Sequence, residues 1–362
     1  MASPPAELAV GPRAGVKVAV ISPYSLDQPG GVQDQVIEIS GRLGQHGIES
    51  WVVGPGSSGP EGAHLLGKGV TLPANGSRAP IALNPLVMSR AAAAIRGADV
   101  IHLHEPLMPL VGWGLLRDVG VPVVGTFHAD PSRFIRSSYR RLQPVARRLV
   151  GRLAGATAVS EVAASAVRGF VADLQIIPNG LDTGLYASPV DKVRNRLVFI
   201  GRDEPRKGLD TLLAAWPSIR LASPDATLDV VGASRSEAAE GVRFLGRVDG
   251  SEKRRVLAEA AVFVAPNLGG ESFGITLLEG MAAGCAVVAS DLPAFQTVGG
   301  SGASYFPRGD SGALAERVLE LIGDEALLTG AATAARRRSD IYDWTTVLPA
   351  YIRLYRSASS GT

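Results

Sequence analysis

Residues 16–22, VKVAVIS, and residues 31–47, GVQDQVIEISGRLGQHG, together form the unit that decides the fold. The first run is short, apolar and rich in β-branched residues, as in a buried strand. In the second, apolar residues recur every three or four positions from Val32 to Leu43, and the pattern ends on two glycines. A strand followed directly by a helix is half of a βαβ unit and predicts a mostly parallel sheet.

The same alternation continues along the chain and then restarts. Further predicted strands of the first series are ESWVVG (49–54), DVIHLHE (99–105), VPVVGTFH (121–128), ATAVS (156–160) and LQIIPNG (174–180). Those of the second series are RLVFIG (196–201), TLDVVG (227–232), VRFLG (242–246), VFVAPN (262–267) and AVVASD (286–291). We therefore predict two Rossmann-like α/β domains, 16–182 and 183–344, after a loose tail at 1–15 and before a terminal helix at 345–362.

Composition excludes several classes of protein. The chain of 362 residues is longer than a domain with a single hydrophobic core usually is. Its net charge of +2 does not indicate nucleic-acid binding. The single cysteine, Cys285, allows no intramolecular disulfide and fits a reducing compartment. The first residues lack a signal-peptide pattern, and no apolar stretch is long enough to predict a membrane span.

Ligands of such sheets bind beyond the carboxyl ends of the strands, so candidate functional residues are expected in the loops there. The first loop, PYSLDQPGGVQ (23–33), places Gly30 and Gly31 just before a helix, where backbone N–H groups can approach an anion. The alternative is a plain tight turn. GTFHADPS (125–132) ends a strand with His128, which can bond a substrate hydroxyl or serve only as a structural loop histidine.

Histidines inside the predicted strand 99–105 are interpreted differently. His102 and His104 alternate with apolar residues, so both are predicted to be packed or hydrogen-bonded rather than catalytic.

Two cations project from GRDEPRKG (201–208). Arg202 and Lys207 suit a diphosphate, which needs its charge neutralised when it departs, whereas Arg206 is predicted to be solvated. The alternative is an ordinary exposed charged loop. No D-x-D pair and no cluster with metal-ligand spacing occurs in the sequence, so this cationic pair is the candidate substitute for a metal.

Two carboxylates lie in NLGGESFGITLLEGMAAG (267–284). Glu271 and Glu279 are eight residues apart, close to a whole number of helical turns. If the intervening residues are helical, both side chains face one cleft. The alternative for Glu279 is a solvated or capped helix residue.

Taken in order, these motifs resemble those of the family 4 glycosyltransferases of GT-B fold. GRDEPRKG is similar to that family's Arg-plus-Lys loop, ESFGITLLE to its E-x7-E motif, and PNGLD and the Gly-Gly loop also fit. PYSLDQPGGVQ, HLHEP, GTFH and FLGRVD narrow the resemblance to the phosphatidylinositol mannosyltransferases of actinobacteria. The resemblance implies two domains facing across a cleft, with the terminal helix returning to the first.

It also implies an activity: retaining, metal-independent transfer of mannose from GDP-mannose to the inositol ring of phosphatidylinositol, by a peripheral protein on the cytoplasmic face of the membrane, without a cofactor. Another nucleotide sugar with a different lipid or small-molecule acceptor is the alternative. A nucleotide-sugar epimerase shares this architecture and is less favoured. A non-catalytic binding protein is also less favoured, because loss of catalysis would relax the need for the four charged residues at 202, 207, 271 and 279, which are all retained.

Residue by residue, the resemblance gives each donor-side position a role. Arg202 and Lys207 bind the donor diphosphate, Glu271 holds mannose hydroxyls, and Glu279 lies at the nucleotide ribose. The positions that shape the sugar and phosphate pocket are Gly270, Phe273, Gly274 and Ile275, and those on the guanine side are Val248 and Lys253.

The other domain supplies the acceptor side. Gly31 approaches the donor across the cleft. Tyr24, Asp27 and Gln33 line the inositol-phosphate side. His128 contacts the transferred sugar near the reacting centre.

Membrane contact has one candidate stretch. Residues 133–152, RFIRSSYRRLQPVARRLVGR, hold seven Arg and no acid, with Ile135, Leu142, Val145 and Leu149 opposite the arginines on a helical wheel. Pro144 is expected to kink or divide such a helix. A solvated face of a domain helix is the alternative, in which case the apolar residues at 85–88 would make the contact.

Overall fold

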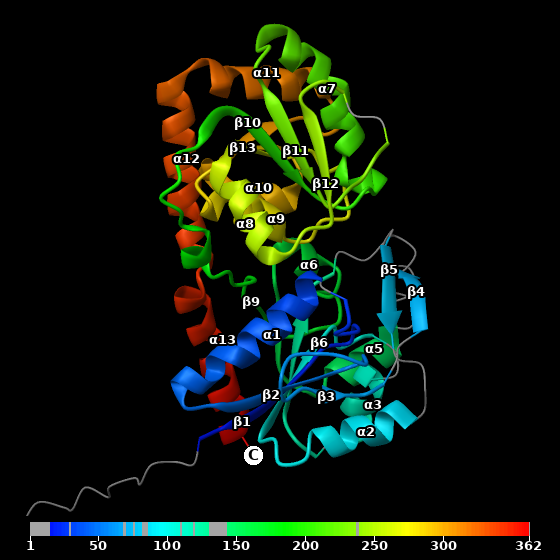
Figure 1. Cartoon of the computed structure of the whole chain (residues 1–362). Coiled ribbons are helices and arrows are strands. Elements are labelled where there is room, and N and C mark those ends of the chain that lie inside the picture. Colours follow the sequence, from blue (N-terminus) through cyan, green and yellow to red (C-terminus); the bar gives the residue numbers. More distant parts are fainter. Residues whose placement is uncertain are drawn as a thin grey trace, which may run out of the picture.

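The computed structural model describes residues 15–28, 30–67, 70–74, 77–81, 86–108, 111–118, 120–129, 143–236 and 239–361; the tail predicted at 1–15 lies almost wholly outside them. Within these residues the chain forms one parallel sheet in each half and an antiparallel hairpin of β4 (Val70–Ala74) and β5 (Ser77–Ile81). Figure 1 shows the two sheet-containing halves one above the other. The predicted α/β architecture of two parallel sheets is confirmed.

The first sheet has seven parallel strands in the order β3-β2-β1-β6-β7-β8-β9. They are β1 (Lys17–Ile21), β2 (Glu49–Gly54), β3 (His64–Leu65), β6 (Val100–His104), β7 (Val123–Phe127), β8 (Leu153–Ala158) and β9 (Leu174–Ile176). The chain runs outward from β1 to β3 and returns to β6 on the other side of β1. The loops after β1 and β6 therefore border the crevice where ligands bind in such sheets.

Helix α1 (Gly31–Leu43) covers this sheet as its pattern predicts. Val36, Ile39 and Leu43 are buried in one cluster with strand residues such as Val18 and Val20. The other helices described before the second sheet are η1 (Gly44–His46), α2 (Leu86–Ala94), α3 (Val111–Asp118), α5 (Gln143–Val150), α6 (Glu161–Ser165) and η2 (Thr183–Tyr186).

The second sheet has six parallel strands in the order β12-β11-β10-β13-β14-β15, which reverses between β10 and β13. They are β10 (Val193–Ile200), β11 (Thr227–Val231), β12 (Val242–Gly246), β13 (Ala260–Ala265), β14 (Ala286–Ser290) and β15 (Ser304–Phe306). The last was not predicted, because three residues are too few to show a periodicity. The helices are η3 (Pro205–Lys207), α7 (Leu209–Ala222), α8 (Gly250–Glu259), α9 (Ile275–Ala282), α10 (Pro293–Gly299), η4 (Gly300–Gly302), α11 (Ser311–Gly323), α12 (Glu325–Ser339) and η5 (Asp340–Tyr342).

The terminal helix α13 (Trp344–Ser360) packs on the first sheet, although the chain has just left the second. Tyr351 and Tyr355 are fully buried in the cluster that also holds Val18 and Val124. Figure 1 shows α12 running along the second half and α13, in red, along the first. The implied return of this helix to the first half is confirmed, and Pro349 lies inside it without ending it.

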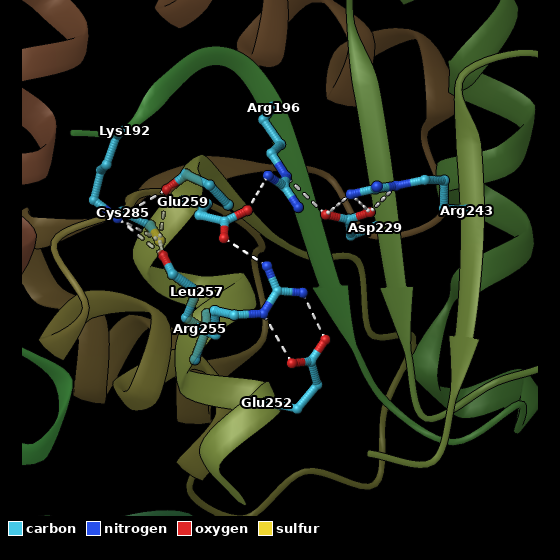
Figure 2. A network of polar contacts seen from close by, with 10 residues as sticks. Lys192, Arg196, Asp229, Arg243, Glu252, Arg255, Leu257, Glu259 and Cys285 are labelled. Atoms are coloured by element: carbon cyan, nitrogen blue, oxygen red, sulfur yellow. Dashed lines mark hydrogen bonds and ion pairs between the residues drawn. The ribbon is translucent and has the colours of Figure 1, made fainter. Parts of the chain in front are cut away.

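A network of ion pairs joins three neighbouring strands of the second sheet (Figure 2). Asp229 of β11 is fully buried and accepts from Arg196 Nε of β10 at 2.8 Å and from Arg243 Nε of β12 at 2.8 Å. Arg196 also pairs with Glu259 at the end of α8. The charge of Asp229 is thus compensated from both neighbouring strands, as a buried carboxylate requires.

Helix α5 is the part of the basic stretch 133–152 that forms a described helix; Arg136 and Arg140 lie outside the described residues. Leu149 is buried, as the alternative of a domain helix implies, whereas Val145 is 47% exposed, so these two apolar residues do not share one buried face. Pro144 is the second residue of α5, and the residues that would precede α5 in a longer helix lie outside the described ones, so the kink or division expected at Pro144 stays a prediction. Among the described helices, none has the length and apolar character needed to cross a bilayer.

Candidate active site

The two loops at the strand reversal of the second sheet interlock. After β13, the backbone N–H of Leu268 donates to the carbonyl of Arg206 after β10 at 2.8 Å. Arg206 in turn donates through Nη1 to the carbonyl of Gly270 at 3.1 Å. Gly208 is required between them, because its φ is +70° and a Cβ there would lie 1.8 Å from the carbonyl oxygen of Pro266. Arg206 therefore braces the second loop, and the prediction that it is solvated is wrong.

The interlocked loops bring Lys207 against Glu271. Lys207 Nζ donates to Glu271 Oε2 at 2.8 Å, and both side chains are mostly buried, with 14% and 16% exposed. Asn267 Nδ2 donates to the same oxygen at 3.1 Å. Arg202 lies on the same loop, 59% exposed and paired with Glu204. An anionic ligand can compete with Glu271 for Lys207, and a displaced Glu271 carboxylate can accept hydroxyl groups of the same ligand.

Glu279 has a separate lysine. It is buried in α9, where Oε1 accepts from Lys253 Nζ at 2.5 Å and from the Tyr186 hydroxyl at 2.7 Å. Burial and this carboxylate together raise the pKa of Tyr186. Glu279 Oε2 is buried and has no hydrogen-bond partner in the part of the chain that the structure describes. A ligand hydroxyl that donates to Oε2 would satisfy the acceptor.

The two carboxylates do not share one helix face, contrary to the simplest expectation for their spacing. Helix α9 begins at Ile275, and Gly274 before it has a φ of +100°, so Glu271 lies in the loop ahead of the helix. A Cβ at Gly274 would lie 2.8 Å from the Phe295 ring. The eight-residue spacing instead places Glu271 beside Lys207 and Glu279 beside Lys253.

Three further positions predicted on the donor side lie in the core, in the braced loop and just before α8. Phe273 is buried, and its ring lies edge-on to that of Tyr342 with 5.6 Å between the ring centroids, so the side chain packs in the core. Gly270 adopts a φ of +64° in the braced loop. Val248 is half-buried against the core just before α8, the helix that carries Lys253.

The two halves of the chain meet at this site. A Cβ at Gly31, the first residue of α1, would lie 3.1 Å from Ile275 Cδ1 at the start of α9. The Ser160 hydroxyl, which caps α6, donates to the carbonyl of Ser272 at 2.5 Å. The first half therefore contacts the residue that directly follows Glu271.

Three residues predicted on the acceptor side belong to the loop after β1 and the helix that follows. Asp27 Oδ1 accepts the backbone N–H groups of Ser57 and Ser58 at 2.8 and 2.7 Å, and bonds led by the Ser58 hydroxyl hold the pKa of its carboxyl well below the usual range. Gln33 donates to two carbonyls of the loop and fixes its path. Tyr24 is half-buried in the same loop.

His128 follows β7 and is held by two consecutive residues at the end of β6. Its Nε2 lies 2.7 Å from His104 Nδ1, and its backbone N–H donates to Glu105 Oε1 at 2.6 Å, as does that of Ala129. His102 and His104 are both buried and hydrogen-bonded, which confirms their prediction. Glu105 was missed; its one sequence signal is a carboxylate placed directly after the strand.

Glu105→Gln is expected to gain stability relative to the wild type between about pH 5 and about pH 8. Burial raises the pKa of the Glu105 carboxyl from 4.5 to about 7, so between those values the folded protein keeps a proton that the unfolded chain releases. The wild type therefore loses stability as the pH rises through about 7, by about 3 kcal/mol at most. Glutamine does not titrate, and its amide oxygen still accepts both N–H bonds.

Urea unfolding of both proteins at the two pH values checks this expectation. The difference between the two free energies of unfolding is the quantity of interest, because all other titrating groups are common to both. A difference that stays constant with pH would show that Glu105 has the pKa of an ordinary carboxyl.

The described residues of the candidate site offer cations rather than a cluster of metal ligands. Among the described residues, no group of three or more His, Cys, Asp and Glu side chains has the arrangement of a metal site. The cations that the interlocked loops carry are those of Arg202, Arg206 and Lys207.

Each half of the chain matches the model of a known protein family. Residues 29–185 match the family model described as Glycosyltransferase Family 4, and residues 194–324 match that of Glycosyl transferases group 1. The chain is 36% identical to the phosphatidyl-myo-inositol mannosyltransferase of Mycobacterium leprae, over 96% of this chain and 98% of that protein. The enzyme of the same name from Propionibacterium freudenreichii is 32% identical, over 96% of each.

Solved structures share the fold. A sucrose-phosphate synthase from Thermosynechococcus elongatus superposes with a TM-score of 0.72 at 19% identity, over 96% of this chain and all of that one. Anabaena Alr3699/HepE in complex with UDP superposes with a TM-score of 0.71 at 20% identity, over 95% and 100%.

Proposed function

The chain belongs to the phosphatidyl-myo-inositol mannosyltransferases within glycosyltransferase family 4, and from that premise we propose that it transfers mannose from GDP-mannose to the inositol ring of phosphatidylinositol. The proposed reaction retains the configuration at the sugar carbon and needs no metal. The observation that carries the proposal is the Lys207–Glu271 pair, which lies where the strand order of the second sheet reverses.

This pair fits the chemistry of a departing diphosphate. The leaving group gains negative charge as the sugar bond breaks, and a fixed cation stabilises the developing charge without a metal. Lys207 takes this role with support from Arg202, while Glu271, released by the diphosphate, accepts mannose hydroxyls. The unpartnered Oε2 of Glu279 offers a second acceptor at the ribose, and Val248 and Lys253 lie on the guanine side.

The acceptor approaches from the first half. Tyr24, Asp27 and Gln33 belong to the segment before and at the start of α1, and Gly31 at its first turn faces Ile275 so closely that an added Cβ would touch it. His128 lies at the adjoining strand end, where it contacts the transferred sugar. The lipid acceptor and the sugar donor thus meet between the points at which the strand order reverses in the two sheets.

The proposal is tested by incubating the protein with GDP-mannose and a phosphatidylinositol-containing lipid extract, with and without EDTA. We expect a mannosylated lipid in both reactions. Isomerisation of the donor would instead support an epimerase. Binding of the donor by the protein without turnover would support a binding protein. Loss of the product in EDTA would contradict metal independence alone.

The proposed acceptor requires peripheral contact with the inner face of the membrane, and we expect weak, salt-sensitive binding to anionic vesicles. Each Lys or Arg near such a surface contributes about 1 kcal/mol within a Debye length. The first 181 residues hold 16 Lys and Arg against 12 Asp and Glu, and 133–152 is their densest basic part. Arg147 lies on the exposed side of α5, where its guanidinium also donates to the Gly169 carbonyl at 2.9 Å.

Vesicle sedimentation at low and high salt measures this binding. Substituting Arg136, Arg140 and Arg147 together by Glu is expected to abolish it. A matched control replaces exposed arginines of the second half, Arg308, Arg317 and Arg337, with the same change of charge. Equal binding by both triple variants would mean that 133–152 does not contact the membrane.

A further inference from the structure

Three histidines lie close together, two in β6 and one directly after β7, and the sugar contact proposed for His128 accounts for one of them. His102 uses both ring nitrogens: Nε2 lies 2.6 Å from the Thr126 hydroxyl, and Nδ1 lies 2.7 Å from the Tyr355 hydroxyl of α13. His104 uses only one. Its Nδ1 lies 2.7 Å from His128 Nε2, and its Nε2 is buried with no partner among the described residues.

The unpartnered nitrogen identifies the tautomer of His104. A neutral imidazole has one N–H and one bare nitrogen. If Nε2 of His104 carried the proton, a buried N–H would lack an acceptor, which folded proteins rarely tolerate, whereas a bare lone pair is the milder defect. The proton of His104 therefore lies on Nδ1 and points at His128 Nε2.

His128 must then accept at Nε2, so its own proton lies on Nδ1. Burial lowers the pKa of His128 to about 3 and that of His104 well below its usual value, so both rings are neutral near pH 7. His128 thus has a donor to offer a ligand at Nδ1 and no charge to transfer. A neutral histidine can polarise a substrate oxygen by donating a hydrogen bond.

We infer that His104 is a positioning residue: it holds His128 in the Nδ1–H form, in which His128 meets the transferred sugar as a neutral hydrogen-bond donor. This inference rests on the proposed function for the sugar contact, although the tautomer itself does not.

The next residue along the chain, Glu105, fixes the main chain of the same histidine. Its carboxylate accepts the N–H groups of His128 and Ala129, and its φ is +52°, a conformation uncommon for a residue with a side chain. This turn allows His104 and Glu105 to hold the ring and the backbone of His128 at once. The ring nitrogen aimed at the sugar is therefore fixed in both position and protonation.

The test begins with nitrogen NMR of the full-length wild type, labelled in its histidine rings, near pH 7. The chain has five histidines, so His104→Asn and His128→Gln are sufficient to assign the two rings. We expect His128 to show a protonated Nδ1 and a hydrogen-bond-accepting Nε2. A protonated Nε2 on His128 would overturn the inference, whether or not the protein transfers mannose.

Turnover then tests the positioning role. In His104→Asn the amide N–H takes the place of Nδ1–H. We expect His128 to keep its wild-type tautomer and kcat to stay within about threefold of the wild-type value. In His104→Phe this donor is lost, and kcat should fall about tenfold with KM for the lipid unchanged. Wild-type kcat in a folded His104→Phe variant would overturn the role. Absence of transfer by the wild type would refute the proposed function and leave the tautomer to be decided by NMR.

Discussion

Lys207→Ala is expected to lower kcat by about 10²–10³, because it removes the cation beside which the diphosphate charge develops. Lys207 is the better placed of the two predicted cations. Its side chain is mostly buried and held 2.8 Å from Glu271, whereas Arg202 is 59% exposed. Solvent weakens the field of an exposed charge, so Arg202→Ala should cost less than Lys207→Ala.

Steady-state kinetics with GDP-mannose measure both losses. Arg317→Ala is a matched control, because it removes an exposed arginine of the same half that pairs with its helix neighbour Glu320. Lys207→Arg retains the charge and should recover part of the activity. A near-normal kcat/KM for Lys207→Ala would mean that the diphosphate binds elsewhere in the cleft.

The largest expected loss of stability is that of Asp229→Ala, about 3 kcal/mol. Asp229 is fully buried and joins Arg196 and Arg243 from the two neighbouring strands. Its removal leaves the mostly buried guanidinium of Arg196 with Glu259 as its remaining ion-pair partner in the part of the chain that the structure describes. An incompletely compensated buried charge is costly, and the surviving partner keeps the loss at the lower end of the usual range.

Urea unfolding measures this free energy, with Arg243→Ala as its control. Arg243 is more than half exposed, and its loss leaves Asp229 paired with Arg196. We expect the control to lose less than half as much stability as Asp229→Ala. Equal losses in the two variants would show that burial of the carboxylate is not the cause.

Much of the fold could be predicted because its elements follow from local patterns. The strand at 16–22 and the helix that starts at Gly31 are found where their apolar spacing placed them. The return of α13 to the first sheet had no local signal, because the apolar face of that helix fits either half; only the family resemblance implied it. The three-residue strand β15 was missed, because it lacks the length that a period requires.

The site was predictable in its residues but less so in its contacts. The Arg-plus-Lys loop and the two glutamates were found by type and spacing, yet the bracing of Gly270 by Arg206 joins residues 64 positions apart. Glu105 was missed for the same reason: its partners His128 and Ala129 belong to another strand end. Contacts between distant loops depend on the order of strands in a sheet, which a single sequence does not contain.

Transfer of mannose from GDP-mannose to phosphatidylinositol is tested most directly through the choice of donor. A panel of nucleotide sugars, with GDP and UDP each carrying mannose or glucose, is presented with phosphatidylinositol vesicles, and the lipid products are identified by mass spectrometry. We expect a phosphatidylinositol that gains one hexose from GDP-mannose, and loss of that product in Lys207→Ala. Turnover of a UDP-sugar with none of GDP-mannose would contradict the proposed reaction.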